Sequence, residues 1–253
     1  MHGRYSYKLP SYLTTFLKQN GVSYVNTSSF TNSFLPFIDS LMVSKNLDKY
    51  RLYIKQIDTL LEQLPKPLNE EFGTILLQNL KAYGQTAVAS LTKEMDSHEP
   101  RDRQMSENLK WIVNQKYPNE KIIVWAHSAH LAKNNQLIRP NSDWDNWRSM
   151  GHYFTQDSTL NKQSYILGFT SKVGIAGRVT LAKTFHVLPP VKNGFEYWLN
   201  KDWKYAFVDF KSFKGPNEYF SMKGKHHLSN EAAWTSVYDG IFYIRDMYPC
   251  DRR

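Results

Sequence analysis

Two stretches within the first hundred residues carry apolar side chains at alternating spacings of three and four, with polar residues between them. This period places the apolar side chains on one face of an α-helix. The first stretch comprises Tyr50, Ile54, Ile57, Leu61 and Leu64, and the second comprises Phe72, Leu76, Leu80, Tyr83, Ala87 and Leu91. Because Pro65-Lys66-Pro67 interrupts the pattern, we predict that residues 30 to 95 form an antiparallel helical hairpin.

The pattern changes after Pro100. Met105, Leu109 and Ile112 predict one more helix, and the apolar run at 121 to 126 has the length of a buried strand. Further helices are expected at 143 to 154 and 194 to 200, and strands at 163 to 169, 179 to 187, 204 to 209 and 238 to 244. This alternation predicts an α/β fold with a mainly parallel sheet flanked by helices. We expect residues 1–98 to form a helical appendage or cap and residues 99–253 to form the α/β portion.

Two histidines stand at the end of the predicted strand, His127 directly after it and His130 three residues later. The carboxyl edge of a parallel sheet is where α/β proteins usually place their functional groups. Such a pair can act as a general base with an electrostatic partner, or as two metal ligands. The pair can equally do no more than hydrogen-bond to backbone groups.

Three segments of the chain together resemble one family. They are Arg101-Asp102-Arg103-Gln104-Met105-Ser106-Glu107-Asn108, then Trp125-Ala126-His127-Ser128-Ala129-His130, and last Ser149-Met150-Gly151-His152. In order and at similar spacing they resemble the R-D-x-x-M-A-x-N, W-A-H-N-x-H and M-G-x-x-L motifs of the erythromycin esterase family of hydrolases. The resemblance implies hydrolysis of an ester or lactone bond by an activated water, a reaction that needs no cofactor.

The resemblance also implies roles for particular residues. His127 would be catalytic or orient the substrate, and Arg101 would reach into the same cleft and bind a carbonyl or carboxylate group. His130, His152 and Ser128 would contact the substrate, although many relatives have asparagine at the position of Ser128. Other polar positions are interpreted as markers of the fold, or as surface and packing residues: Glu196, Asp209, the Tyr238-Asp239-Gly240-Ile241 stretch, His186, His226 and His227.

One family motif is missing from this sequence. Members of the family open with a strand ending in G-E-x-x-H-G, whose glutamate and histidine activate the hydrolytic water. These 253 residues contain no such motif, and the one His-Gly pair is His2-Gly3. We therefore expect the chain to correspond to the carboxyl-terminal part of the family fold, truncated at its amino terminus. Such a fold would have an exposed sheet edge, through which the chain could form oligomers.

Composition narrows the range of partners. The chain has 253 residues, of which 41% are hydrophobic, and this is enough to bury a core. Its net charge is +9, but the lysines and arginines are spread among acidic residues and form no basic run. We expect a small-molecule substrate and neither a nucleic-acid nor a membrane partner. The single cysteine, Cys250, excludes an intrachain disulfide and a cysteine metal cluster. The first residues of this sequence contain no apolar signal-peptide core, so from the sequence as given we expect a cytoplasmic protein.

These observations lead to one functional hypothesis and two alternatives. The hypothesis is an erythromycin esterase-like hydrolase that is incomplete and inactive by itself. The first alternative is a non-catalytic remnant that binds a small molecule without turnover. The second is a metal-dependent hydrolase that uses His127 and His130, with His152 as a third ligand.

Overall fold

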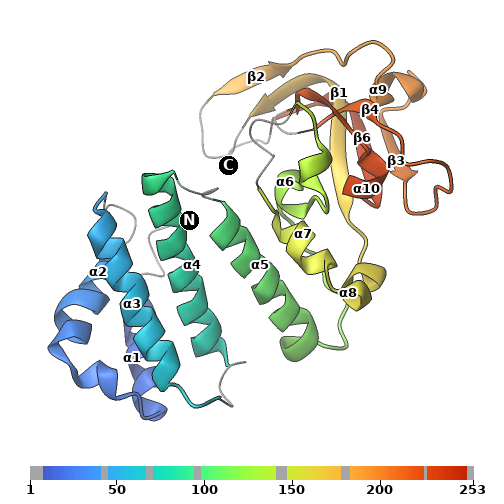
Figure 1. Cartoon of the computed structure of the whole chain (residues 1–253). Helices are drawn as coiled ribbons and strands as arrows, with labels where there is room; N and C mark the ends of the chain where they lie inside the picture. Colours follow the sequence, from blue (N-terminus) through green and yellow to red (C-terminus); the bar gives the residue numbers. More distant parts are fainter. Residues whose placement is uncertain are drawn as a thin grey trace. The chain divides into compact units, whose positions relative to one another are not determined.

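The computed structural model describes residues 8–40, 45–66, 71–93, 98–140, 147–177, 183–224 and 227–249. The chain divides into two compact units, Met1–Lys121 and Ile122–Arg253 (Figure 1). His226, Cys250 and the start of the helix expected at 143 lie outside the described residues. None of the helices in the described ranges combines the length and apolar character needed to cross a membrane.

The unit Met1–Lys121 is helical. Its α-helices are α1 (Leu9–Gln19), α2 (Leu35–Ser40), α3 (Leu47–Gln63), α4 (Phe72–Thr92) and α5 (Glu99–Trp111), and its shorter turns are η2 (Ser23–Asn26), η3 (Phe30–Phe34) and η5 (Ile112–Lys116). The Asn46 side chain caps α3 by accepting a hydrogen bond from the Lys49 N–H, and α4 ends where Lys93 turns left-handed at φ 57°.

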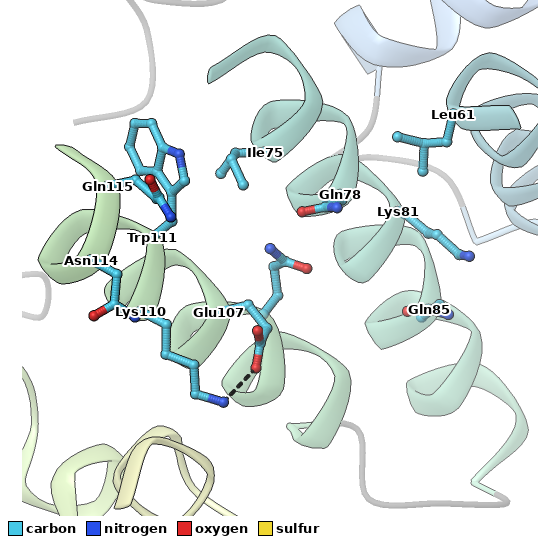
Figure 2. A pocket seen from close by; sticks show the side chains of 11 residues that line it. Leu61, Ile75, Gln78, Lys81, Gln85, Glu107, Lys110, Trp111, Asn114 and Gln115 are labelled. Carbon is cyan, nitrogen blue, oxygen red and sulfur yellow. Dashed lines mark hydrogen bonds and ion pairs between the residues drawn. The ribbon is translucent and has the colours of Figure 1, made fainter. Parts of the chain in front are cut away.

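The core of this unit lies where α3 and α4 pack on each other and on α1 and η3. Its fully buried side chains include Leu13, Leu17, Phe34, Tyr53, Ile57, Leu60 and Leu77. Gly73 of α4 sits directly against the ring of Phe16, where a Cβ atom would come within 2.4 Å of the ring. A polar pocket opens between α4 and α5 (Figure 2).

The unit Ile122–Arg253 combines short helices with strands. Its helices and turns are α6 (Ser128–Leu131), η6 (Asn135–Leu137), α7 (Met150–Thr155), α8 (Ser158–Gln163), α9 (Phe195–Trp198) and α10 (Trp234–Val237). Its strands are β1 (Leu167–Gly177), β2 (Thr184–Val187), β3 (Tyr205–Asp209), β4 (Phe220–Lys223), β5 (Ser229–Ala232) and β6 (Gly240–Met247).

The main sheet of this unit has the strand order β2-β1-β6-β3. Its central pair, β1 and β6, is parallel with Thr170 opposite Tyr243, whereas the two outer pairs are antiparallel. The combination of helices with a four-stranded sheet is compatible with the predicted α/β class, but the sheet is mixed and not mainly parallel as predicted. The short connection from β1 to β2 explains part of the difference, because parallel neighbours need a long crossover.

The strand predicted at 121 to 126 is a second correction. These residues lie outside any helix or strand, and the side chains of Ile123 and Trp125 are 93% and 86% exposed. Ile122 and Val124, at 36% and 38%, are more covered, so the segment keeps a two-residue alternation. An apolar run becomes a strand only when a neighbouring backbone satisfies its N–H and C=O groups, and no strand among the described residues pairs with this one.

The two faces of the main sheet differ in burial. One face carries Ile241 and Tyr243, which are both fully buried, and Ile241 belongs to the core that side chains of α6, α9 and α10 also form. On the opposite face Phe169, Phe242 and Phe207 stand opposite one another on three strands, and Phe169 and Phe207 are 39% and 56% exposed. Trp125 packs edge-on against Phe169 at a ring-centroid distance of 5.9 Å. We call the side chains of Trp125, Phe169, Phe242, Phe207 and Tyr205 the aromatic face; Phe242 is half-buried and the other four are exposed.

Candidate functional site

The two predicted histidines occupy a single short turn. His127 is the N-cap of α6, and its Nδ1 atom accepts a hydrogen bond of 3.2 Å from the Ala129 backbone N–H. His130 lies within α6, with its ring centroid 6.4 Å from that of His127 and 5.4 Å from that of Trp147. His127 is exposed, whereas His130 is half-buried. The structure therefore brings these two residues together at the surface.

The position of the turn is held by contacts to its backbone. The Tyr238 hydroxyl donates to the Ser128 carbonyl at 3.2 Å, and the Ser149 hydroxyl donates to the Ala132 carbonyl. Burial raises the pKa of Tyr238 far above its ordinary value, so this hydroxyl stays protonated and remains a donor. Gly151 lies so close to the Leu131 carbonyl that a Cβ atom there would come within 1.9 Å of the oxygen. A glycine is therefore required where α7 meets α6.

His152, on α7, borders a polar pocket of about 350 Å³. Its Nδ1 atom lies 3.1 Å from the Lys133 carbonyl and its Nε2 atom 3.0 Å from the amide nitrogen of Gln156. A carbonyl can only accept and an amide nitrogen can only donate, so His152 is neutral with its proton on Nδ1. Among the described residues that line the pocket are Asn134, Asn161 and Thr235, but neither His127 nor His130.

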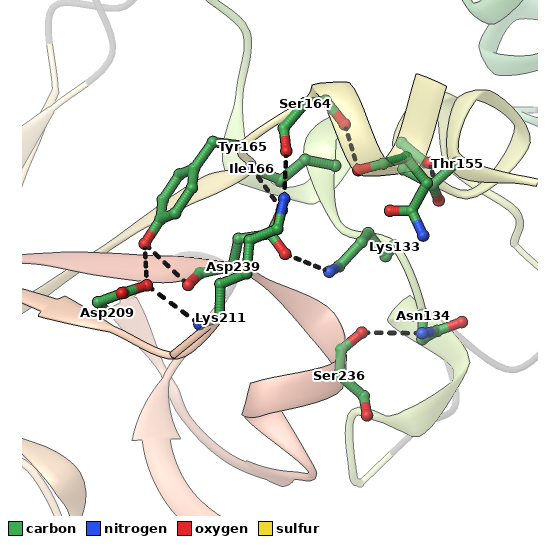
Figure 3. Close-up of polar contacts among 12 residues, drawn as sticks. Lys133, Asn134, Thr155, Ser164, Tyr165, Ile166, Asp209, Lys211, Ser236 and Asp239 are labelled. Atoms are coloured by element: carbon green, nitrogen blue, oxygen red, sulfur yellow. Dashed lines mark hydrogen bonds and ion pairs between the residues drawn. The ribbon is translucent and has the colours of Figure 1, made fainter. Parts of the chain in front are cut away.

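Asp239 connects this region to the sheet (Figure 3). Its Oδ1 atom pairs with the Lys133 ammonium at 2.7 Å, and its Oδ2 atom accepts from the Ile166 N–H at 2.8 Å. Its backbone carbonyl accepts from the Tyr165 hydroxyl at 2.9 Å and from the Lys211 N–H at 2.8 Å. With 4% exposure, Asp239 thus joins the segment after α6 to the start of β1 and the end of β3.

A second carboxylate extends this network. The Tyr165 hydroxyl donates to Asp209 Oδ1 at 2.6 Å, and Ser212 donates to Asp209 Oδ2. The hydrogen bonds from Ser212 and Tyr165 lower the pKa of Asp209, while partial burial and the bond to Asp209 raise the pKa of Tyr165. Asp239 thus holds Lys133, two residues after the histidine turn, and Asp209 holds Tyr165 in the same network, contacts that the sequence pattern did not reveal. The sequence feature that could have identified these two residues is their position, because Asp209 ends β3 and Asp239 directly precedes β6.

Arg101 belongs to the other unit. It lies exposed in the first turn of α5, next to Asp102, which is fully buried. Deeper in the helix Asn108 exchanges hydrogen bonds with Asn79 of α4 at 2.9 and 2.7 Å. The motif that contains Arg101 therefore also contributes a contact between α5 and α4.

No group of three or more histidine, cysteine, aspartate or glutamate side chains in the described ranges is arranged to hold a metal ion. Of the predicted ligands, His127 and His130 lie in the same turn with the ring separation given above. Ser128 is half-buried between them and contributes its carbonyl to the bond from Tyr238.

Comparison with known proteins matches most of the chain. A sequence model of the family described as Erythromycin esterase matches residues 58–246, a range that includes Arg101, His127, His130 and His152. A protein of Bacillus subtilis (strain 168) named "Putative hydrolase YbfO" is 30% identical over 161 residues, which are 59% of this chain and 35% of that protein. The chain therefore spans about a third of the length of that relative. No solved structure matches the chain.

Proposed function

Because the chain belongs to the erythromycin esterase family, we propose that it carries the oxyanion-stabilising part of a hydrolase that cleaves an ester or lactone bond with an activated water. The relative named as a hydrolase supports the reaction class. The substrate is proposed to be a small molecule, and no cofactor takes part in the reaction as we propose it. The observation that carries this proposal is the hydrogen bond from Ala129 to His127.

That hydrogen bond decides which nitrogen of His127 can react. A backbone N–H can only donate, so Nδ1 must offer its lone pair, and the proton of the neutral ring resides on Nε2. An Nε2–H group is a hydrogen-bond donor. In acyl transfer such a donor stabilises the negative oxygen that develops in the tetrahedral intermediate, a contribution of about 3–4 kcal/mol for a well-placed group.

The same geometry is unsuited to general-base catalysis by His127. A base needs a free lone pair directed at the water, whereas the lone pair of Nδ1 is engaged by Ala129 and Nε2 carries the proton. We propose that the base is supplied by a glutamate and a histidine of the family's G-E-x-x-H-G motif, which these 253 residues do not contain. The chain alone would then hydrolyse substrate no faster than buffer does.

The remaining predicted residues take supporting roles in this proposal. Arg101 belongs to the other unit, and we propose from the family motif that its exposed guanidinium binds a carbonyl or carboxylate group. His130, with its edge on Trp147, and Ser128 line the substrate beside His127. Both ring nitrogens of His152 have protein partners, so we propose that it transfers no proton. Its proposed contact with the substrate is as part of the wall of the polar pocket.

Binding without turnover is the second candidate function. The absence of G-E-x-x-H-G from the sequence favours it, because the anchored turn and the polar pocket beside His152 would persist without any base. The two candidates differ in one outcome. A fusion that places a family member's G-E-x-x-H-G segment before Met1 gains hydrolysis under the first candidate and gains none under the second.

The role of His127 is tested by its tautomer and by two substitutions. Long-range nitrogen NMR of the imidazole, assigned by its loss in His127→Ala, should show the proton on Nε2. In the fusion, His127→Gln keeps an N–H donor and should retain much more activity than His127→Ala. His186→Ala, an exposed histidine on β2, serves as the control. A proton on Nδ1, or equal losses in the two His127 variants, would refute the donor role.

A further inference from the structure

The helical unit contains a pocket that the proposed reaction does not use, and Gln104 and Glu107 of the motif that begins at Arg101 line part of it. It lies between α4 and α5 and has a volume of about 670 Å³ (Figure 2). That volume is within the range of about 300–1,000 Å³ that is usual for small-molecule sites. Its lining differs from the usual apolar one, because five amide side chains contribute to it: Gln78, Gln85, Gln104, Asn114 and Gln115.

The charged groups of the pocket are already neutralised by protein partners. The Lys81 ammonium lies 2.5 Å from the Asp58 carboxylate, and the Lys110 ammonium lies 2.8 Å from Glu107. An anionic ligand would have to compete with these carboxylates for the lysines, and a cation would have to compete with the lysines for the carboxylates. The pocket is therefore electrostatically suited to an uncharged ligand.

The amide groups determine the kind of uncharged ligand. Each amide offers an N–H₂ donor and a C=O acceptor, a combination that matches hydroxyl groups, which also donate and accept. Gln104 is held in place because its amide nitrogen donates to Asn108 Oδ1 at 3.0 Å, and Asn108 is in turn paired with Asn79. At least one of the amides is thus oriented before any ligand arrives, which lowers the entropy cost of binding.

An aromatic surface adjoins one end of the pocket. Trp111 lines the pocket, and its ring lies 6.3 Å from that of Phe72, which lies 5.8 Å from that of Tyr12. Phe72 is 52% exposed and Tyr12 is 42% exposed, so this row of rings continues from the pocket onto the surface. Figure 2 shows Trp111 near Ile75 on the opposite helix. Exposed rings of this kind bind the apolar C–H face of a partner ring.

We propose that this pocket and the row Trp111–Phe72–Tyr12 bind a short neutral oligosaccharide. Sugar rings carry both features that the site requires, because hydroxyl groups surround the edge of each ring and C–H groups cover its face. Trp111 stacks on the sugar in the pocket, and Phe72 and Tyr12 contact the rings that extend from it. A peptide would satisfy the amides with its backbone, but it would not supply hydroxyl groups at each of these positions.

The test uses the full chain and three neutral trisaccharides, maltotriose, cellotriose and N,N′,N″-triacetylchitotriose, with binding measured by saturation-transfer NMR and titration calorimetry. At least one should bind, and Trp111→Ala should weaken that binding about tenfold. Phe72→Ala should weaken it less. Trp203→Ala removes a tryptophan that is 50% exposed in the other unit and should leave the affinity unchanged.

Gln78→Ala decides the question if Trp111→Ala does not fold, because Gln78 is half-buried and its truncation leaves the aromatic row in place. It should weaken binding several-fold. Binding by none of the three trisaccharides would overturn the proposal. It would also be overturned if the folded Trp111→Ala and Gln78→Ala variants bound the trisaccharide with wild-type affinity. A clear preference for a proline-rich peptide or for a trisaccharide of uronic acids would have the same consequence.

Discussion

The ion pair between Lys133 and Asp239 should contribute strongly to the stability of the unit that contains the histidine turn. The two side chains are 15% and 5% exposed, and the Nζ to Oδ1 distance is 2.7 Å. At an effective dielectric constant of about 20, two unit charges at this distance attract by about 6 kcal/mol, much of which offsets their desolvation. Removing one partner leaves the other charge buried, which costs about 3–5 kcal/mol.

Asp239→Asn isolates the charge, because the amide oxygen can still accept from Ile166 while its N–H₂ group faces the Lys133 ammonium. We expect it to lower the free energy of unfolding by about 3 kcal/mol. Lys133→Met should do the same, and the double variant should lose about 2 kcal/mol less than the sum of the two. Asp246→Asn is the matched control, since the Arg245–Asp246 pair is 31% and 38% exposed and should contribute less than about 1 kcal/mol.

The assay is urea unfolding followed by tryptophan fluorescence, because six of the seven tryptophans lie in the unit Ile122–Arg253. A shift in midpoint at constant slope reports the change in stability. If Asp239→Asn and Asp246→Asn had the same effect, or if the two single substitutions were additive, Asp239 would not be the connection between the segment after α6 and the sheet.

Three further outcomes follow from other contacts. Burial lowers the pKa of Lys223 from 10.5 to about 8, so between these pH values the unfolded chain binds more protons than the folded chain. The free energy of unfolding should therefore rise with pH from about 8 to 10.5, and Lys223→Met should remove this rise. The aromatic face should cause the chain to self-associate, and Phe207→Glu should shift its sedimentation toward that of the monomer. Phe213→Glu, which changes an exposed ring outside the aromatic face, should leave the sedimentation unchanged. The zinc content of the purified chain should stay well below one ion per chain, and it should be the same in the double variant His127→Ala, His130→Ala. One zinc ion per chain that is lost in the double variant would favour the metal-dependent alternative.

The periodic parts of the sequence predicted local structure well. The spacing of Tyr50, Ile54 and Ile57 corresponds to α3, and the strand expected at 204 to 209 corresponds to β3 (Tyr205–Asp209). These elements depend on side chains that lie close together in sequence, and the spacing of such side chains determines which face is buried.

Long-range pairing could not be predicted in the same way. The apolar run at 121 to 126 has the composition of a buried strand, but strand formation depends on a neighbour that the run itself does not specify. β4 and β5 were not expected, because the Phe220–Lys223 and Ser229–Ala232 segments are too short and too polar to show a period.

The geometry of the candidate site could be predicted only in part, for the same reason. The adjacency of His127 and His130 is a local property of one turn, and the structure shows it. The contacts that hold the turn join residues about twenty to more than a hundred positions apart, as in the bonds from Tyr238 to Ser128 and from Lys133 to Asp239. The hydrogen bond that determines the tautomer of His127 depends on backbone geometry and has no sequence signal.

The most direct test of the central claim is the rate of ester hydrolysis by the purified chain, with p-nitrophenyl acetate and erythromycin as substrates. A general base contributes about a hundred- to ten-thousand-fold, and His127 with Nδ1 engaged by Ala129 cannot supply it. We predict that the chain alone matches the buffer rate and that the fusion carrying G-E-x-x-H-G exceeds it. Steady hydrolysis by the chain alone that disappears in His127→Ala would contradict the account, because it would show a self-sufficient site with His127 as its base.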